Sequence, residues 1–250
     1  MRERRNYINS SLVILFFLMI WQIGAALYNK PFILPTPGEI AAELWELKAV
    51  LIIKHLPSTI IIILIGLAFS VALGITLAVL MNFSKSAERT FYPILIASQT
   101  IPIIALAPIF VLWFGYSIWS KIVVTVLITF FPITVSTFDG LRSVSKDLKE
   151  LMLTMGAGKR EVFLKLSVPS ALPHFFSGLK VAVTLSVIGA AIGEWLGAEA
   201  GLGYFSRRMM TQFNGAAVFA PIVLLSIAGI VLFLLVTLCE NIFLKWRKSL

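Results

Sequence analysis

The residues that could do chemistry in this chain are few, and their spacing argues against the common catalytic sites. A phosphate-binding loop needs two glycines five positions apart, the second followed by Lys and then Ser or Thr. Gly158-Lys159 is followed by Arg160, and Leu153 stands where the first glycine is required. The two histidines and the single cysteine lack the spacing of metal ligands. We therefore expect this chain to bind no nucleotide, metal or other cofactor of its own.

Three further residues stand out because they interrupt apolar runs. Pro102 and Pro108 share one run with Pro93, and proline removes a backbone donor and kinks a helix. That run is either a bent helix that lines a pathway or a kinked helix that only packs. Glu194 lies near the end of another run, where a carboxylate is costly unless it is paired. It is either a pathway or gate residue, or an interfacial carboxylate that reaches water beside Trp195.

The elements that hold these residues are predicted to be membrane-spanning helices. The chain has 250 residues, of which 59% are hydrophobic and 13% are charged, whereas soluble domains have about 45–50% apolar and about 25% charged residues. A spanning helix needs about 20 mostly apolar residues, and barrel strands would alternate instead. Continuous apolar runs occur at 11–28, 57–81, 91–114, 119–138, 174–197 and 217–243. The sequence predicts an all-α polytopic membrane protein with about six transmembrane helices, in one domain over residues 1–250.

The positive charges between these runs predict the orientation of the chain. Fourteen of the 21 Lys and Arg residues lie in one alternate set of connections: 1–10, 82–90, 139–173 and 244–250. Because cytoplasmic connections carry the excess of Lys and Arg, both termini and the 139–173 connection are predicted to be cytoplasmic. Lys180 lies inside a run, so its ammonium group is expected to reach toward the inner surface. This topology accounts for the net charge of +9 without a nucleic-acid partner.

A short amphipathic helix is predicted in the outer connection over residues 35–47. Its apolar and acidic side chains recur at helical spacing on opposite faces: Ile40, Leu44 and Leu47 against Glu39, Glu43 and Glu46. A helix of this kind can lie along the surface of the membrane and contact lipid.

The long cytoplasmic connection is predicted to form one or two amphipathic helices around a turn. Its apolar side chains recur in two groups: Leu148, Leu151, Met152 and Met155, then Val162, Phe163 and Leu166. Gly156-Ala157-Gly158 falls between the groups, and glycine permits a sharp turn and a close approach of another backbone. Pro169 and Pro173 are expected to break the chain before the next apolar run. A charged loop with apolar faces suits a partner that holds a helix in a groove.

This connection resembles the cytoplasmic signature of the binding-protein-dependent ABC importer permeases. That signature is Glu-Ala-Ala, three residues, Gly, nine residues, Ile, one residue and Leu-Pro. The corresponding positions here are Glu150-Leu151-Met152, Gly156, Leu166 and Val168-Pro169, with Leu and Met in place of the two alanines. The resemblance implies that a set of residues contacts an ATPase subunit and couples it to the pathway: Glu150, Leu151, Met152, Gly156, Ala157, Gly158, Leu166 and Pro169.

Other stretches are similar to the nitrate, sulfonate and taurine branch of this family: 34–37, 107–115, 171–173, 178–180 and 201–203. Gln99–Pro102 and Gly193–Ala198 look closest to permeases for a thiamine precursor, hydroxymethylpyrimidine, or for riboflavin. The resemblance implies a transport subunit of the bacterial inner membrane, not an enzyme, that forms the pathway for a small solute. It also implies three partners: an outer solute-binding protein, a subunit that uses ATP, and a second permease chain, which we expect to be an identical copy.

Two other classes of membrane protein compete with this interpretation. An intramembrane protease needs a nucleophile and a base at membrane depth, but both histidines lie at the ends of apolar runs. A self-sufficient secondary transporter needs ionisable residues that face inward for ion coupling, and Glu194 is the single candidate. A requirement for ATP in reconstituted vesicles separates the two kinds of transporter.

Overall fold

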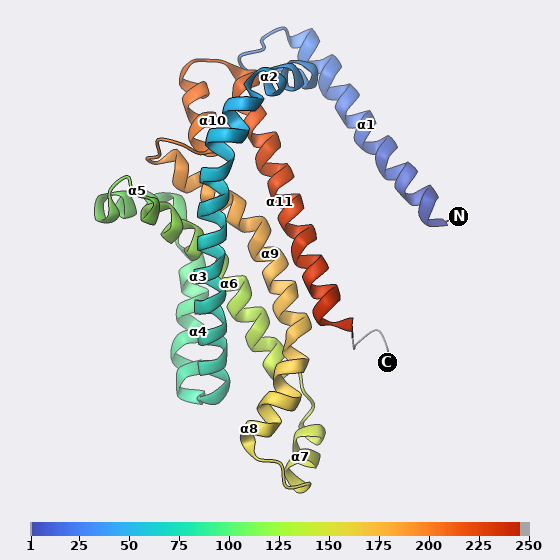
Figure 1. The fold of residues 1–250 in the computed structure, drawn as a ribbon, viewed down its shortest axis with the longest axis vertical. Coiled ribbons are helices and arrows are strands. Elements are labelled where there is room, and N and C mark those ends of the chain that lie inside the picture. Colours follow the sequence, from blue (N-terminus) through green and yellow to red (C-terminus); the bar gives the residue numbers. More distant parts are fainter. Residues whose placement is uncertain (1, 246–250) are drawn as a thin grey trace. The chain divides into compact units, whose positions relative to one another are not determined.

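The computed structural model describes residues 2–245, with side chains described from Leu12 onward. Every regular element in this part of the chain is helical (Figure 1), which confirms the predicted all-α class. In chain order the elements, with two π-helical turns marked η, are α1 (Arg2–Tyr28), α2 (Pro37–Val50), η1 (Leu51–His55), α3 (Leu56–Phe83), α4 (Lys85–Thr100), α5 (Ile103–Phe114), α6 (Ile118–Arg142), α7 (Lys146–Thr154), α8 (Lys159–Val162), η2 (Phe163–Ser167), α9 (Val168–Trp195), α10 (Leu202–Thr211) and α11 (Gly215–Phe243).

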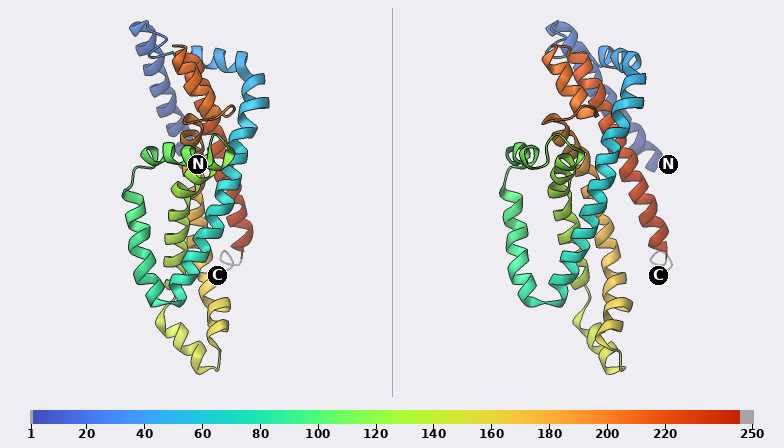
Figure 2. Two further views of the ribbon diagram at one scale, coloured as in Figure 1. Left: turned by 90° about the vertical axis from the view of Figure 1, so that its left-hand side faces the viewer. Right: turned by 60° about the vertical axis from the view of Figure 1, so that its left-hand side comes forward.

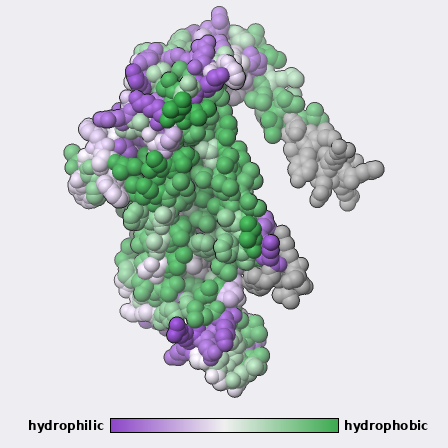
Figure 3. Space-filling view, in the orientation of Figure 1, coloured by the Kyte–Doolittle hydropathy of each residue, from purple (hydrophilic) through white to green (hydrophobic). Residues whose placement is uncertain are grey.

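Within residues 2–245, four helical stretches are long and apolar enough to cross a membrane: Pro37–Phe83, Ile118–Arg142, Lys159–Trp195 and Gly215–Phe243. The bent pair α4–α5 would be a fifth if it forms one span. The described part of the first predicted span, Leu12–Tyr28, is apolar but shorter. Large hydrophobic side chains cover the exposed faces of the long helices (Figure 3), and exposed apolar surface of this extent marks contact with lipid or another protein. A polytopic membrane protein is therefore confirmed, while the number of spans, about six, stays a prediction.

The third predicted span, 91–114, is not one helix. α4 ends at Thr100, α5 begins at Ile103, and the two axes are bent by 99° (Figure 2). Ile101 and Pro102 have extended backbone angles, and Pro102 cannot donate the bond that would continue α4. The bend expected from the prolines is therefore present, and it takes the form of a break between two helices at Pro102.

Contacts divide the chain into two compact units, which are described separately below. Unit 1 comprises residues 1–59 and 199–225, and unit 2 comprises residues 60–198 and 226–250. The predicted single domain over residues 1–250 stays a prediction.

The centre of unit 2 is the pairing of α6 with α9, where glycines bring the two helices together. A Cβ atom on Gly178 would lie 2.6 Å from the carbonyl oxygen of Pro132. A Cβ atom on Gly189 would lie 2.9 Å from the Cα atom of Thr125. Such short approaches require residues without a side chain, and small residues are the usual contact of packed membrane helices.

Buried hydroxyl groups along α6 are satisfied within the helix. Four of them donate to the carbonyl four residues earlier, at 2.6–2.9 Å: Thr125, Thr129, Thr134 and Thr137. The Thr129 hydroxyl also lies 2.6 Å from that of Ser70 on α3. An unsatisfied polar group costs several kcal/mol, roughly, in a medium without water. These bonds therefore let α6 carry polar side chains in the core of unit 2.

Pro169 and Pro173 do not break the chain, contrary to the expectation from sequence. The helix is continuous from Lys159 to Trp195. The π-helical turn η2 precedes Pro169, which lies in the first turn of α9, where a missing N–H costs least. One wider turn accommodates the proline, so the cytoplasmic connection continues into α9 as a single helix.

In unit 1, α2 forms where the amphipathic pattern predicted a helix. The Thr36 hydroxyl accepts from the Glu39 N–H at 3.2 Å, and the Glu39 carboxylate accepts from the Thr36 N–H at 2.7 Å. This capping box fixes the start of the helix. Trp21 Nε1 donates to the Pro35 carbonyl at 3.1 Å, which ties α1 to the chain just before α2.

A second tie in unit 1 joins η1 and the first turn of α3 to the start of α10. His55 is buried, and its Nδ1 accepts from the Gly201 N–H at 3.1 Å. The Thr59 hydroxyl accepts from the Leu202 N–H at 2.9 Å. The first N–H groups of a helix have no partner within it, so these two side chains anchor α10.

The contact at Gly178 gives a test of the packing in unit 2. We expect Gly178→Ala to destabilise the protein by about 1–3 kcal/mol, because the new Cβ atom meets a backbone carbonyl that cannot move away. The measurement is the thermal midpoint of the purified protein in detergent. Gly24→Ala on α1 is the matched control, since its Cβ atom would meet nothing within 4 Å. Equal midpoints for the two variants would contradict the packing argument.

Candidate functional site

The first candidate site is the α7–α8 hairpin, which consists of α7, the turn Gly156-Ala157-Gly158 and α8. Gly156 has a left-handed φ of 86°. Its N–H donates to the Leu153 carbonyl, and the Ala157 N–H donates to the Met152 carbonyl, both at 3.0 Å. This pair of bonds is the Schellman arrangement, in which a glycine ends a helix. The turn predicted from sequence is present, and its backbone favours glycine at position 156.

Glu161 holds the second arm of the hairpin. Its Oε2 atom accepts from the Gly158 N–H at 3.1 Å, and its Oε1 atom lies 2.9 Å from the Lys165 ammonium group. The carboxylate thus supplies an acceptor at the start of α8, where helix N–H groups lack partners. Gly158 precedes the first residue of α8, and Glu161 stands three positions later, where a glutamate is a sequence signal for the start of a helix.

The hairpin exposes apolar side chains to solvent. α7 buries none of its residues, and Leu151 and Met155 are 56% and 78% exposed. Hydrophilic and hydrophobic surface lie next to each other over this region (Figure 3). Apolar surface grouped in this way on a polar loop is typical of a protein contact. A shallow recess of about 250 Å³ is lined by Met152, Met155, Gly156, Ala157 and Glu161.

The structure brings together part of the coupling set inferred from sequence. Three of its members line the recess and three more are exposed on the hairpin: Met152, Gly156 and Ala157, then Glu150, Leu151 and Gly158. Leu166 and Pro169 lie farther along, half-buried in η2 and α9. Met155 and Glu161 line the recess as well, although the coupling set did not include them. The role of the whole set stays a prediction.

The candidate pathway residues lie on two helices in different environments. Pro102 precedes α5 and Pro108 lies within it, and both are exposed. Glu194 is 1% exposed in α9, so the alternative in which it reaches water at an interface is wrong. The two helices meet in an apolar cluster of Ala107, Phe110 and Val124, with Ile192 and Leu196 packed against it. α5 therefore contacts the end of α9 that carries Glu194.

Lys121 is a second buried charge near this end of α9. Its Nζ atom donates to the carbonyl oxygens of Tyr116 and Ser117 at 2.7 and 3.0 Å. A Cβ atom on Gly193 would lie 2.9 Å from the Cα atom of Lys121. Because Gly193 precedes Glu194, a buried cation and a buried carboxylate occupy adjoining turns of α6 and α9. The burial of Lys121 depends on its contact with α9, so no local pattern in the sequence indicates it.

Lys180, whose ammonium group was expected to reach toward the inner surface, forms an ion pair that the sequence did not indicate. Its Nζ atom lies 2.9 Å from the Glu240 carboxylate, and the two side chains are only 24% and 20% exposed. The pair joins α9 to α11, with Phe176 and Phe243 in ring contact nearby at 6.0 Å. Pairing lowers the cost of placing both charges within apolar segments.

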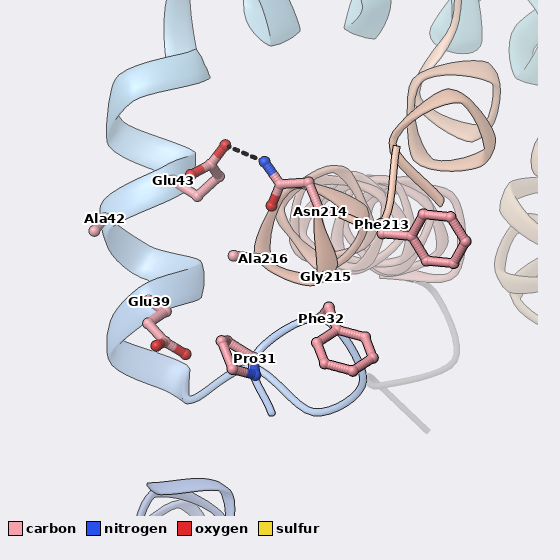
Figure 4. A pocket seen from close by; sticks show the side chains of 9 residues that line it. All are labelled: Pro31, Phe32, Glu39, Ala42, Glu43, Phe213, Asn214, Gly215 and Ala216. Carbon is pink, nitrogen blue, oxygen red and sulfur yellow. Dashed lines mark hydrogen bonds between the residues drawn. The ribbon is translucent and has the colours of Figure 1, made fainter. Parts of the chain in front are cut away.

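Unit 1 contains a separate recess of about 440 Å³ (Figure 4). It is lined by Pro31, Phe32, Glu39, Ala42, Glu43, Phe213, Asn214, Gly215 and Ala216. Figure 4 shows Glu43 and Asn214 pointing toward each other, with Nδ2 and Oε1 3.3 Å apart. Phe213 has a left-handed φ of 55° and is 76% exposed. The recess leaves no signal in the sequence, because the residues that meet in it, such as Glu43 and Asn214, are 171 positions apart.

Over the part of the chain that the structure describes, no group of three or more His, Cys, Asp or Glu could hold a metal ion. The expectation that this chain binds no cofactor of its own stays a prediction.

Known proteins resemble the chain over almost its whole length. A family model described as "Binding-protein-dependent transport system inner membrane component" matches residues 70–246. The formylaminopyrimidine transport permease protein ThiX of Halalkalibacterium halodurans is 57% identical over 248 residues, which cover 98% of this chain and 99% of that protein. The riboflavin transport system permease protein RibX of Chloroflexus aurantiacus is 31% identical, over 94% of this chain and 89% of that protein. The taurine transport system permease protein TauC of Escherichia coli is 26% identical, over 86% and 79%.

Proposed function

The chain belongs to the family of binding-protein-dependent transport system inner membrane components, and we propose that the solute it carries is a formylaminopyrimidine, a thiamine precursor. As a member it is the permease subunit of an ATP-driven importer and not an enzyme. The substrate proposal is supported by 57% identity over 98% of the chain to a permease named for that solute. Permeases named for riboflavin and taurine are 31% and 26% identical.

A permease of this family works in the inner membrane with an ATP-hydrolysing subunit and a solute-binding protein. We place the binding protein on the outer side, where the positive-inside rule puts α2 and α10. The recess of unit 1, with two carboxylates and two phenylalanines, is our candidate contact for that partner. ATP is used by the separate subunit, since this chain lacks the phosphate-binding loop.

We assign the solute pathway to the region around Glu194, Pro102 and Pro108. A polar solute crosses an apolar belt only where protein groups replace its hydrogen bonds to water. Glu194 and Lys121 are buried polar groups on α9 and α6 of unit 2. An aminopyrimidine carries N–H donors and ring-nitrogen acceptors, which match a carboxylate and an ammonium group. The bend at Pro102 sets the angle between α4 and α5, so a movement of this pair changes the position of α5 beside the pathway, as a gate requires.

We propose that the α7–α8 hairpin is the cytoplasmic contact with the ATPase subunit. Its exposed leucine and methionine side chains fit a hydrophobic groove. The turn at Gly156 gives the hairpin a fixed shape, so a push on α7 is passed to α9 through α8 and η2. In this proposal, closure of the ATPase subunits on ATP moves the hairpin and changes the side on which the pathway opens.

We also place a second copy of this chain in the importer. A pathway enclosed by helices needs more walls than one permease supplies, and a symmetric pair is the commonest closed assembly. The exposed apolar faces of α1 and α11 then contact lipid or the second copy.

The first experiment tests the substrate. The permease, its ATPase subunit and its binding protein are reconstituted in proteoliposomes. We expect these vesicles to take up labelled formylaminopyrimidine only when ATP is present on the side of the membrane that carries the ATPase subunit. Excess riboflavin or taurine should leave this uptake unchanged. Uptake of riboflavin, taurine or a sulfonate instead would refute the substrate, and uptake driven by an ion gradient without ATP would indicate a secondary transporter.

The second experiment tests the orientation and the hairpin contact. In a Cys239→Ala chain, Met155→Cys should react with an impermeant maleimide only from the cytoplasmic side, because Met155 lies at the exposed tip of the hairpin. Assembly with the ATPase subunit should protect it. Glu46→Cys on α2, which is also exposed, should react only from outside. Labelling of Met155→Cys from outside would overturn both the orientation and the coupling proposal.

The third experiment compares two glycines of the turn. Gly156→Ala should lower transport about tenfold, because a β-carbon at a left-handed φ carries about 1–3 kcal/mol of strain and reshapes the turn. Gly158→Ala is the matched control, since its φ of −73° suits alanine and its Cβ atom would meet nothing within 4 Å. The measurements are transport and the stimulation of ATP hydrolysis by loaded binding protein. Equal effects in the two variants would show that the left-handed turn is not what matters.

A further inference from the structure

We propose that the turn between α3 and α4 grips the chain on both sides of the α7–α8 hairpin and carries the movement of the hairpin to α4 and α5. The end of α6, which leads into the hairpin, is called here the outgoing arm, and η2, which follows it, is called the return arm. The contact consists of four residues, called here the clamp: Phe83, Glu88, Arg142 and Phe163. All of them lie in unit 2. This inference rests on the proposed role of the hairpin in coupling, and it names the residues that receive the movement inside the permease.

The outgoing arm is held by an ion pair. Both terminal nitrogens of Arg142 bind Glu88, with Nη1 to Oε1 at 2.6 Å and Nη2 to Oε2 at 2.7 Å. Two parallel bonds fix the orientation of the guanidinium group as well as its distance. The same guanidinium group lies 4.6 Å from the ring centre of Phe138, which is in turn 6.0 Å from the ring of Tyr92 on α4. Arg142 is therefore held by α4 directly and through α6.

The return arm is held by an aromatic contact. Phe83 is the last residue of α3, and its ring centre lies 4.7 Å from that of Phe163, the first residue of η2. This distance is within the range of favourable ring pairs. Phe163 also packs against the buried cluster that includes Leu95 of α4 and Phe138 of α6. A displacement of either arm is therefore passed to the same turn, the one between α3 and α4.

The clamp lies close in sequence to both ends of the hairpin. Arg142 ends α6 three residues before Ser145, which caps α7, and Phe163 follows α8 directly. Both arms of the hairpin therefore meet one short turn within a few residues of their roots. The start of α4 is fixed next to the turn, because the Ser84 hydroxyl caps the helix by accepting from the Ala87 N–H at 3.2 Å. A hairpin that moves must take this turn with it or break both contacts.

The exposure of the ion pair argues for a role in motion more than in folding. The side chains of Arg142 and Glu88 are 48% and 26% exposed, and ion pairs in contact with water add little to stability. Removal of one of its charges should therefore leave the fold intact. The bidentate geometry of the pair nevertheless passes a sideways force from one helix to the other.

The far end of this route is the broken helix pair. α4 leads from Glu88 to Thr100, where the chain bends by 99° into α5 (Figure 2). α5 packs through Ala107 and Phe110 against Leu196, near the buried Glu194 of α9. A shift of α4 therefore changes the angle of α5 beside the proposed pathway.

The test measures movement of α5 directly and does not depend on which solute is carried. Ile104 of α5 is 66% exposed, so Ile104→Cys in a Cys239→Ala chain reports its surroundings by its rate of maleimide labelling. In the complete importer, ATP with vanadate should change this rate. Glu88→Gln should reduce the ATP-dependent change at least about fivefold, the lower range of coupling between sites. The ATPase subunit should still co-purify and should still respond to loaded binding protein.

Two further variants isolate the ion pair. The exchange of charges in Glu88→Arg/Arg142→Glu should restore the change, which a purely local structural defect would not allow. Arg89→Gln removes a charge from the neighbouring exposed residue of the same turn and should have no effect.

Three results would overturn the inference. They are a full labelling change in Glu88→Gln, a failure of the exchanged pair to restore it, and loss of the ATPase subunit from Glu88→Gln, which would make the pair an assembly contact. A parent importer with no ATP-dependent change at Ile104→Cys would show that α5 does not move and would also overturn this inference, whereas the earlier comparison of Gly156→Ala with Gly158→Ala tests the hairpin alone. The two proposals therefore fail in distinguishable ways.

Discussion

The close approach of α6 and α9 is the constraint on which the rest of unit 2 depends. Gly178 and Gly189 let the two helices meet at distances that a β-carbon would prevent. A helix pair packed in this way behaves as one stiff body, because interiors at crystal-like density resist small displacements. The α7–α8 hairpin is mounted on this body, since its arms leave from the end of α6 and return through α8 and η2 into α9. Force applied at the hairpin is therefore not absorbed at its root.

The same packing decides where charge can be kept away from lipid. Gly193 lies against Lys121, which brings a cation that the sequence places at the start of α6 into a buried position. The neighbouring Glu194 is buried as well. Hydroxyl groups on α6 return their hydrogen bonds to their own helix, so the polar content of this pair does not disturb its packing. The result is an apolar exterior around a core that is partly polar, which is what a solute pathway requires.

Local patterns in the sequence were sufficient for the features that form locally. Apolar runs located the long helices, and Gly156 with its neighbours located the turn of the hairpin, because a left-handed φ selects glycine whatever surrounds it. The break at Pro102 was only half predicted: three prolines indicated a bend, but not which one ends a helix. Pro169 shows the opposite error, since η2 accommodates it within a continuous helix.

Features made by distant segments left no local signal. The recess beside Asn214, the burial of Lys121 and the pairing of Lys180 with Glu240 all depend on helices that are far apart in the chain. The environments of both lysines are set by helices that are distant in sequence, so neighbouring residues in the sequence do not predict them.

The ion pair between Lys180 and Glu240 has a consequence for biogenesis. The two residues are 60 positions apart, so α9 leaves the ribosome well before α11. A lone lysine can keep its ammonium group at the headgroup level during that interval, because its side chain is long. Glu240 has a shorter side chain and is synthesised later, when Lys180, the cation that neutralises it, has already been synthesised. A chain truncated before α11 would leave the lysine without its counter-charge, so the completed α11 is what allows Lys180 to stay within an apolar segment.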